Sequence, residues 1–121
     1  MQELKEKLPV MSEAEGSIVQ GTDWGDMKVS YMQFAKGMDA SPLLEGLPDN
    51  MCPCPHWGYM LKGKIRIGYK DGREEIVEEG QLYYMPPGHT MKVEEDTEMV
   101  EFSPIKEMNE VLNHIASKLK A

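Results

Sequence analysis

The sequence predicts an all-β domain, a sandwich or barrel of short antiparallel strands, followed by one C-terminal helix. Two observations support this fold class. Short strand-like segments follow one another at spacings of roughly ten residues and are separated by Gly, Pro and Asp. Apolar residues at helical spacing become clear only near the end of the chain. A parallel α/β sheet would instead require helices between its strands.

Each expected strand is short and has the alternating or apolar pattern of a half-buried strand. The dipeptides Lys62-Gly63, Asp71-Gly72 and Glu79-Gly80 lie between such segments, and their glycines supply the positive φ that tight hairpins need. The expected strands are 17–20, 27–35, 56–61, 64–69, 74–78, 81–85 and 91–94.

The segments around these strands have other patterns. Residues 103–120 predict a helix, since Ser103 suits the N-cap and Pro104 the first turn. We expect its apolar stripe to pack on the barrel or on a second subunit. Residues 1–16 predict an arm or a short helix. Residues 38–50 predict a loop that can cover a pocket. The acidic run 93–98 predicts a solvated turn.

Composition indicates one soluble domain spanning residues 1–121, with the barrel at 17–102. The chain is 40% hydrophobic and 28% charged, as in ordinary globular proteins. A net charge of -8 without a Lys/Arg cluster disfavours nucleic acid and anionic membranes as partners. No apolar run is long enough for a membrane span or a signal peptide, so we expect a cytoplasmic protein. The eleven methionines are interpreted as adaptable core residues.

Both cysteines and two of the three histidines lie in two segments rich in Pro and Gly, CPCPHWGY (52–59) and MPPGHT (85–90). Cys52, Cys54 and His56 have the same parity, so an extended backbone would direct them to one face. Thiolate and imidazole are donors for zinc, iron, nickel or copper. The alternative is a structural role, with buried thiols and a packed imidazole. His114, on the predicted helix, is expected at the surface or at an interface.

The two cysteines are too close in sequence for an unstrained disulfide, which leaves free thiols, metal ligands or intermolecular partners. A thiol-based mechanism at Cys52 or Cys54 stays open if an imidazole lowers the thiol pKa. The sequence has no nucleophile elbow, no phosphate-binding glycine loop and no dinucleotide fingerprint. Hydrolase, kinase and dehydrogenase functions therefore have no support.

The segments HWGYMLKGKIRIGYKDG and GQLYYMPPGHTM resemble the two conserved motifs of the cupin superfamily, which are small jelly-roll barrels. Gly63 matches the glycine of the first motif. Gly80, Pro86 and Gly88 match the second motif at the family's spacing. The resemblance covers residues 50–102 and implies a double-stranded β-helix.

The metal-binding positions of that family differ here. By the family's spacing, His56 stands where the motif has its glutamate, Cys52 at the second histidine and Asn50 at the first. Met91 occupies the histidine position of the second motif, and His89 lies two residues earlier. The usual three-His, one-Glu set is therefore absent, and its metal preference and chemistry do not carry over.

The chain is also similar to a set of small bacterial cupins, mostly of unassigned activity, that have a Cys, three residues, His-x-Gly-Tyr motif and a later Pro-Gly-His. That resemblance implies that Cys52, His56 and His89 act together. A Cys/His/His set suits a divalent transition metal, and Cys54, which has the same parity as Cys52 and His56, is a further candidate ligand. Zinc and iron are the expected metals, with one open coordination position.

Two functions remain open at this point. One is a small-molecule-binding protein with a metal in the barrel, which could act as a metal-dependent enzyme on a small organic substrate. The other is a metal-free module for ligand binding or sensing. Trp24, Tyr84 and Met91 are the predicted pocket residues. A homodimer is expected from family habit and from the need to cover sheet edges and the helix stripe.

Overall fold

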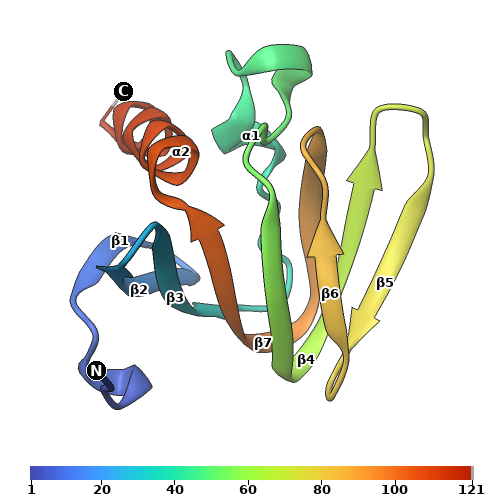
Figure 1. Ribbon diagram of the computed structural model, residues 1–121. Helices are drawn as coiled ribbons and strands as arrows, with labels where there is room; N and C mark the ends of the chain where they lie inside the picture. The colour runs from blue at the N-terminus through green and yellow to red at the C-terminus, as the bar shows by residue number, and fades with distance from the viewer. Residues whose placement is uncertain (121) are drawn as a thin grey trace.

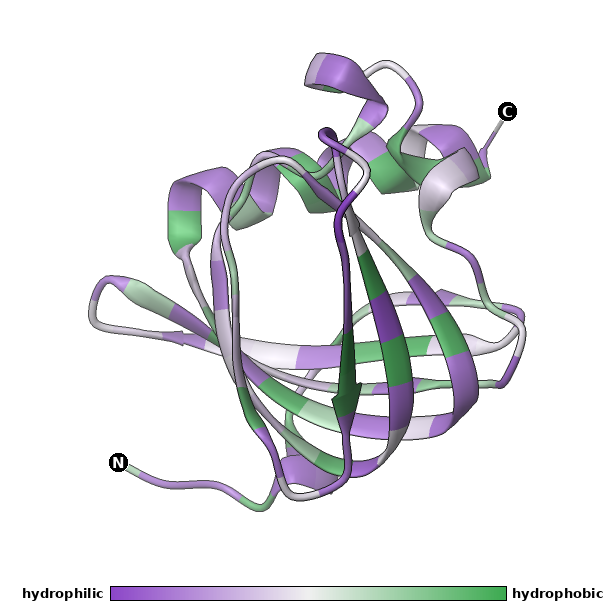
Figure 2. Ribbon diagram, turned by 90° about the vertical axis from the view of Figure 1, so that its right-hand side faces the viewer, coloured by the Kyte–Doolittle hydropathy of each residue, from purple (hydrophilic) through white to green (hydrophobic). Residues whose placement is uncertain are grey.

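The computed structural model describes residues 1–120 and contains one strongly curved antiparallel sheet (Figures 1 and 2). The chain has the predicted all-β jelly-roll architecture with a C-terminal helix, α2 (Ile105–Leu119). β5 and β6 share the edge of β4 that lies opposite β7. In spatial order the strands are β1 (Val10–Ala14), β2 (Ser17–Trp24), β3 (Met27–Phe34), β7 (His89–Pro104), β4 (His56–Tyr69) and β5 (Glu74–Glu78), with β6 (Leu82–Met85) paired to β4.

The two central strands, β4 and β7, are longer than the sequence predicts. The segments expected as two strands, 56–61 and 64–69, form one continuous strand, so the predicted hairpin at Lys62-Gly63 is wrong. An irregular register with β7 occurs there instead. Gly63 has a φ of 96°, and a Cβ on it would lie 2.3 Å from the carbonyl oxygen of Asp96. The glycine therefore permits a close crossing of the two strands.

The prediction of a solvated turn in the acidic run 93–98 is wrong, because this run is the middle of β7. Val93 and Thr97 are buried, whereas Glu95 and Asp96 are exposed. This pattern keeps the carboxylates in water while the strand pairs with β3 and β4. The predicted turns at Asp71-Gly72 and Glu79-Gly80 are confirmed, with positive φ at both glycines.

The N-terminal part contains more structure than an arm. A single 3₁₀ turn, η1 (Lys5–Lys7), is followed by β1, which the sequence analysis missed. The expected loop at 38–50 contains the short helix α1 (Ser41–Leu44) and the 3₁₀ turn η2 (Pro48–Asn50). Together with α2 this segment lies across one end of the curved sheet (Figures 1 and 2).

The C-terminal helix packs its apolar stripe on the barrel, which was one of the two expected arrangements. Met108 and Val111 are buried there. The helix begins after Pro104, so the predicted N-cap at Ser103 is wrong. Ser103 is instead a residue of β7, and its side chain is fully buried. No helix within residues 1–120 is long and apolar enough to cross a membrane.

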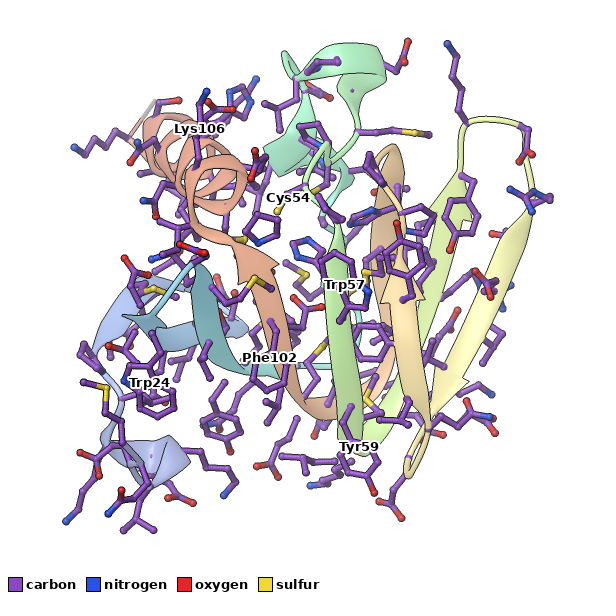
Figure 3. All side chains as sticks on the ribbon, viewed as in Figure 1. Trp24, Cys54, Trp57, Tyr59, Phe102 and Lys106 are labelled. Carbon is purple, nitrogen blue, oxygen red and sulfur yellow. The ribbon has the colours of Figure 1, made fainter. Side chains whose placement is uncertain are left out.

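Large aromatic and aliphatic side chains form a patch on the outer face of β6, β4 and β7. Cross-strand partners share a face, so the pairs of Trp57 with Phe102 and Tyr84, and of Tyr59 with Leu82, place all five side chains together. Figure 3 shows three of them, Trp57, Tyr59 and Phe102, along the front of the sheet. Trp57 stacks on Tyr84 with ring centroids 5.2 Å apart. Each of the five is at least 40% exposed.

We predict that two copies of the chain pair through this aromatic patch. Five half-exposed side chains present on the order of 500 Å² of mostly apolar surface, close to the apolar share of the roughly 800 Å² that each partner buries in a standard interface. Sedimentation is expected to give a dimer for the wild type and a monomer for L82E/Y84E, which adds charge to the patch. The matched control V10E, at an exposed β1 position, should stay dimeric. A monomeric wild type at micromolar concentration would remove the homodimer.

Candidate functional site: a thiol and two imidazoles in an apolar cavity

Backbone pairing joins the two segments that carry the candidate ligands. The amide of Cys52 donates to the carbonyl of His89 over 2.8 Å, and the amide of Gly88 donates to the carbonyl of Cys52, also over 2.8 Å. His56 is the first residue of β4 and His89 the first residue of β7. The thiol and the two imidazoles therefore meet where two central strands begin.

Cys52, His56 and His89 form a tight buried cluster. Their ligating atoms all lie within 4.8 Å of one another. The Sγ of Cys52 is 3.5 Å from the Nε2 of His56, and the two imidazole rings meet edge to face with centroids 5.1 Å apart. The three residues are 3 to 6% exposed. The structure thus brings together the three residues that the sequence grouped.

Hydrogen bonds at the Nδ1 atoms fix the orientation of the two imidazole rings. The Nδ1 of His89 lies 2.7 Å from the carbonyl oxygen of Pro86. Because a carbonyl only accepts, Nδ1 must carry the proton, which leaves the Nε2 lone pair of the neutral ring free. The Nδ1 of His56 lies 2.7 Å from the Oγ of Ser103, and its Nε2 faces Cys52. Such outer bonds orient histidines that bind metals.

Burial determines the protonation of the cluster. Desolvation lowers the pKa of His56 to about 4, and desolvation together with the charge of His56 lowers the pKa of His89 to about 4. Both rings are therefore neutral at pH 7, as metal coordination requires. Desolvation raises the pKa of the Cys52 thiol to about 12, and desolvation likewise raises that of Cys54 to about 12. Without a bound cation these thiols are poor nucleophiles, so the thiol-based mechanism loses its basis.

A buried carboxyl group, Glu101, lies next to the cluster, and the sequence analysis missed it. Its Oε1 is 3.7 Å from the Nδ1 of His56, and its Oε2 accepts a 2.7 Å hydrogen bond from the hydroxyl of Tyr83. Desolvation raises the pKa of Glu101 to about 7. A signal existed, because Glu101 has the same parity as the buried residues Met99 and Ser103. The last strand expected from the sequence ends at residue 94, and the prediction therefore did not extend this alternation to Glu101.

The cluster and Glu101 line a cavity of about 110 Å³. Its walls come from β1, β2, β3, β4, β6 and β7, from the 38–44 segment and from α2. Among the residues that the structure describes, Glu101 is the one acidic side chain in the wall, and no Lys or Arg lines it. The 38–50 segment and α2 supply apolar side chains, in line with the expectation that this segment covers a pocket.

The other predicted site residues are placed differently. Met91 lines the cavity. Cys54 is fully buried but outside the three-residue cluster, and its thiol donates to the carbonyl oxygen of Pro55 over 3.3 Å. Tyr84 does not line the cavity, because the parity of β6 turns it outward onto Trp57. Trp24 also lies outside the cavity wall, because it is at the end of β2 opposite to Ser17 and Val19, which line the cavity, and Figure 3 shows it apart from Cys54.

His114 was expected at the surface or at an interface, and it lies at a contact within the chain. Its Nε2 is 2.7 Å from the carbonyl oxygen of Glu45, so it ties α2 to the segment after α1. Gly46 packs against the same ring, because a Cβ at this position would lie 3.0 Å from the Cε1 of His114. The helix α2 and the 38–44 segment, which immediately precedes Glu45, both form part of the cavity wall.

The comparison with solved structures finds similar folds at low sequence identity. A conserved protein of unknown function from Streptococcus pyogenes is 20% identical, with a TM-score of 0.58 over 86% of this chain and 85% of that one. A RmlC-like cupin from Shewanella frigidimarina is 16% identical, with a TM-score of 0.60 over 84% and 88%. Bacillus subtilis oxalate decarboxylase is 19% identical, with a TM-score of 0.58 over 83% of this chain and 28% of that enzyme.

No family model and no curated protein matches the sequence. At identities of 20% or less, the structural neighbours establish the fold and leave the activity open. The antiparallel jelly-roll sheet, the C-terminal helix and the cupin neighbours agree with one another. The chain therefore has the cupin fold.

Proposed function

We propose that the protein binds a divalent transition metal, zinc or iron, through Cys52, His56 and His89, and presents it to a small organic molecule in the adjoining cavity. The observation that carries the proposal is the convergence of one thiol and two neutral imidazoles, with the free lone pair of His89 fixed by its bond to Pro86. A thiolate and two imidazoles are donors that both metals accept.

The spacing of the cluster fits a tetrahedral centre with small adjustments. For metal–nitrogen and metal–sulfur bonds of about 2.0 and 2.3 Å, nitrogen and sulfur ligands lie roughly 3.5 Å apart. The Cys52 and His56 atoms already have this separation. The remaining distances, up to 4.8 Å, would have to shorten by rotation of the side chains when a metal binds. Three protein ligands leave a fourth position, as catalytic and substrate-binding centres do.

When bound, the metal would supply Lewis acidity or an activated water at that position. The protein's own groups would orient the site and manage protons. Ser103 and Pro86 hold the two imidazoles, and Glu101 places a carboxyl group against His56 inside the cavity. These groups suit a metal-dependent reaction on a small substrate. The oxalate chemistry of one structural neighbour is not part of the proposal, because no cationic side chain in the described wall would pair with a dicarboxylate.

A metal-free ligand-binding module is the second candidate. It is favoured by the raised pKa of Cys52 and by the weak bond of its thiol to the carbonyl oxygen of Cys54, at 3.7 Å, which together describe a packed, neutral thiol. The cavity would then bind its ligand through apolar contacts alone. Metal stoichiometry separates the two candidates.

The first test measures metal content and affinity by elemental analysis and by titration of the metal-free protein with Zn²⁺ or, under anaerobic conditions, Fe²⁺. One equivalent is expected in the wild type, and C52S, H56Q and H89Q should each bind at least about tenfold more weakly. C54S is the matched control, because Cys54 is equally buried but outside the cluster, and it should bind like the wild type. Equal trace amounts in all variants would leave the metal-free module.

The protonation states also make the stability of the metal-free protein depend on pH. Between pH 6.5 and 4, His56 and His89 bind protons only when the chain is unfolded. Their contribution to the free energy of unfolding is therefore complete above pH 6.5 and is lost as the pH falls towards 4. Glu101 acts in the opposite direction. Between pH 4.5 and 7 its carboxyl keeps a proton only in the folded chain, so acidification favours folding. Because two imidazoles oppose one carboxyl, the net effect of acidification is a loss of unfolding free energy.

We therefore predict that the metal-free wild type loses roughly 1 kcal/mol of unfolding free energy from pH 6.5 to pH 5.5. E101Q keeps an acceptor for Tyr83 but removes the opposing titration, so its loss over the same interval should be about twice as large. Urea denaturation at the two pH values measures both changes. An E101Q profile that is flatter than that of the wild type would contradict the assigned protonation of Glu101.

A further inference from the structure

We propose that the cavity takes small aliphatic molecules with a single donor group, of which short-chain monocarboxylates are the test class. The inference rests on the proposed function, because the donor group would occupy the open position of the metal. It is carried by the chemistry of the cavity wall rather than by the cluster itself.

Methionine dominates that wall. The eleven methionines of the chain are divided almost evenly between the cavity and the rest of the molecule. Unbranched thioether side chains are flexible and polarizable, so they adapt to apolar ligands of differing shape. The six methionines that line the cavity are Met32, Met38, Met85, Met91, Met99 and Met108.

Polar groups that a second charged group of a ligand could use are scarce. Apart from the cluster and Glu101, the polar side chains in the wall are Ser12, Ser17 and Thr90, and the Thr90 hydroxyl is already 2.9 Å from that of Ser41. No Lys or Arg of the described chain lines the cavity. A buried carboxylate without a cation is costly, so a ligand with two carboxylates is rejected and one with an aliphatic tail is accepted.

The size of the cavity limits the length of that tail. A dry aliphatic cavity of about 150 Å³ holds benzene, which has six carbon atoms. The cavity here measures about 110 Å³, which in proportion holds roughly four non-hydrogen atoms, so it suits the four-carbon chain of butyrate with the carboxylate oxygens directed at the cluster. Leu112 and Ile115 of α2 form part of the wall, and a much longer chain would have to displace this helix.

The test follows the ¹³C-labelled methyl groups of all eleven methionines in the metal-loaded full chain by NMR. Butyrate should shift the signals of the six cavity methionines. Succinate, which has the same four-carbon chain and a second carboxylate, should shift none of them at the same concentration. Signals of the methionines outside the wall serve as internal controls: Met1, Met11, Met27, Met51 and Met60.

A pair of variants tests the position of the ligand. Leu112 lines the cavity, and L112W fills it, so the affinity for butyrate should fall about tenfold or more. Asn113 is the next residue on α2 and is exposed, so N113W should bind butyrate like the wild type. Metal content is measured on the same samples.

The outcomes separate the two proposals. Stoichiometric metal with equal responses to butyrate and succinate, or with no methyl shifts, overturns the aliphatic ligand class and leaves the metal site. Protein without metal whose six cavity methionines respond to the neutral probe 1-butanol, and respond less in L112W, supports the aliphatic cavity and removes the metal site. Equal butyrate binding by L112W and the wild type places the ligand elsewhere and overturns the inference.

Discussion

The short backbone pairing between Cys52 and the Gly88–His89 segment is the constraint on which the candidate site depends. It joins the chain before β4 to the beginning of β7, and it places a thiol beside two imidazoles. The pairing uses main-chain groups only, so it does not depend on which side chains occupy these positions. A fold that closes here can therefore vary its ligands while it keeps the site in place.

Burial then gives these groups their chemistry. The same desolvation keeps both imidazoles neutral and keeps the Cys52 thiol protonated. Neutral imidazoles are ready to coordinate a cation, whereas the thiol becomes a strong ligand only when a cation replaces its proton. The site is thus compatible with the metal that we propose and poorly suited to a free nucleophilic cysteine. Glu101 adds a buried carboxyl group whose charge is also set by desolvation.

The C-terminal helix α2 and the 38–44 segment complete the cavity that the central strands begin. Both elements place apolar side chains in the cavity wall, and His114 ties α2 to Glu45, the residue that follows the 38–44 segment. The opposite, outer face of β4 and β7 carries the aromatic patch. Side chains alternate between the two faces of β4 and β7. The inner face therefore carries the polar cluster in the cavity, and the outer face carries the exposed aromatic patch.

The sequence by itself determined the fold class, the C-terminal helix and the proximity of Cys52 and His56, because alternation, turn glycines and short spacings are local properties. His89 joined this group only through the resemblance to small bacterial cupins, because its contact with Cys52 spans distant segments. It did not determine that Gly63 is a crossing point rather than a hairpin turn, nor that β7 runs through the acidic segment 93–98. Those features depend on pairing between strands distant in sequence. Ser103 shows the same limit, since it is suited to cap a helix but bonds to His56 from β7. The outward turn of Tyr84 and the burial of Glu101 were likewise decided by the tertiary structure, because the register of a strand against its neighbours sets which face each side chain takes.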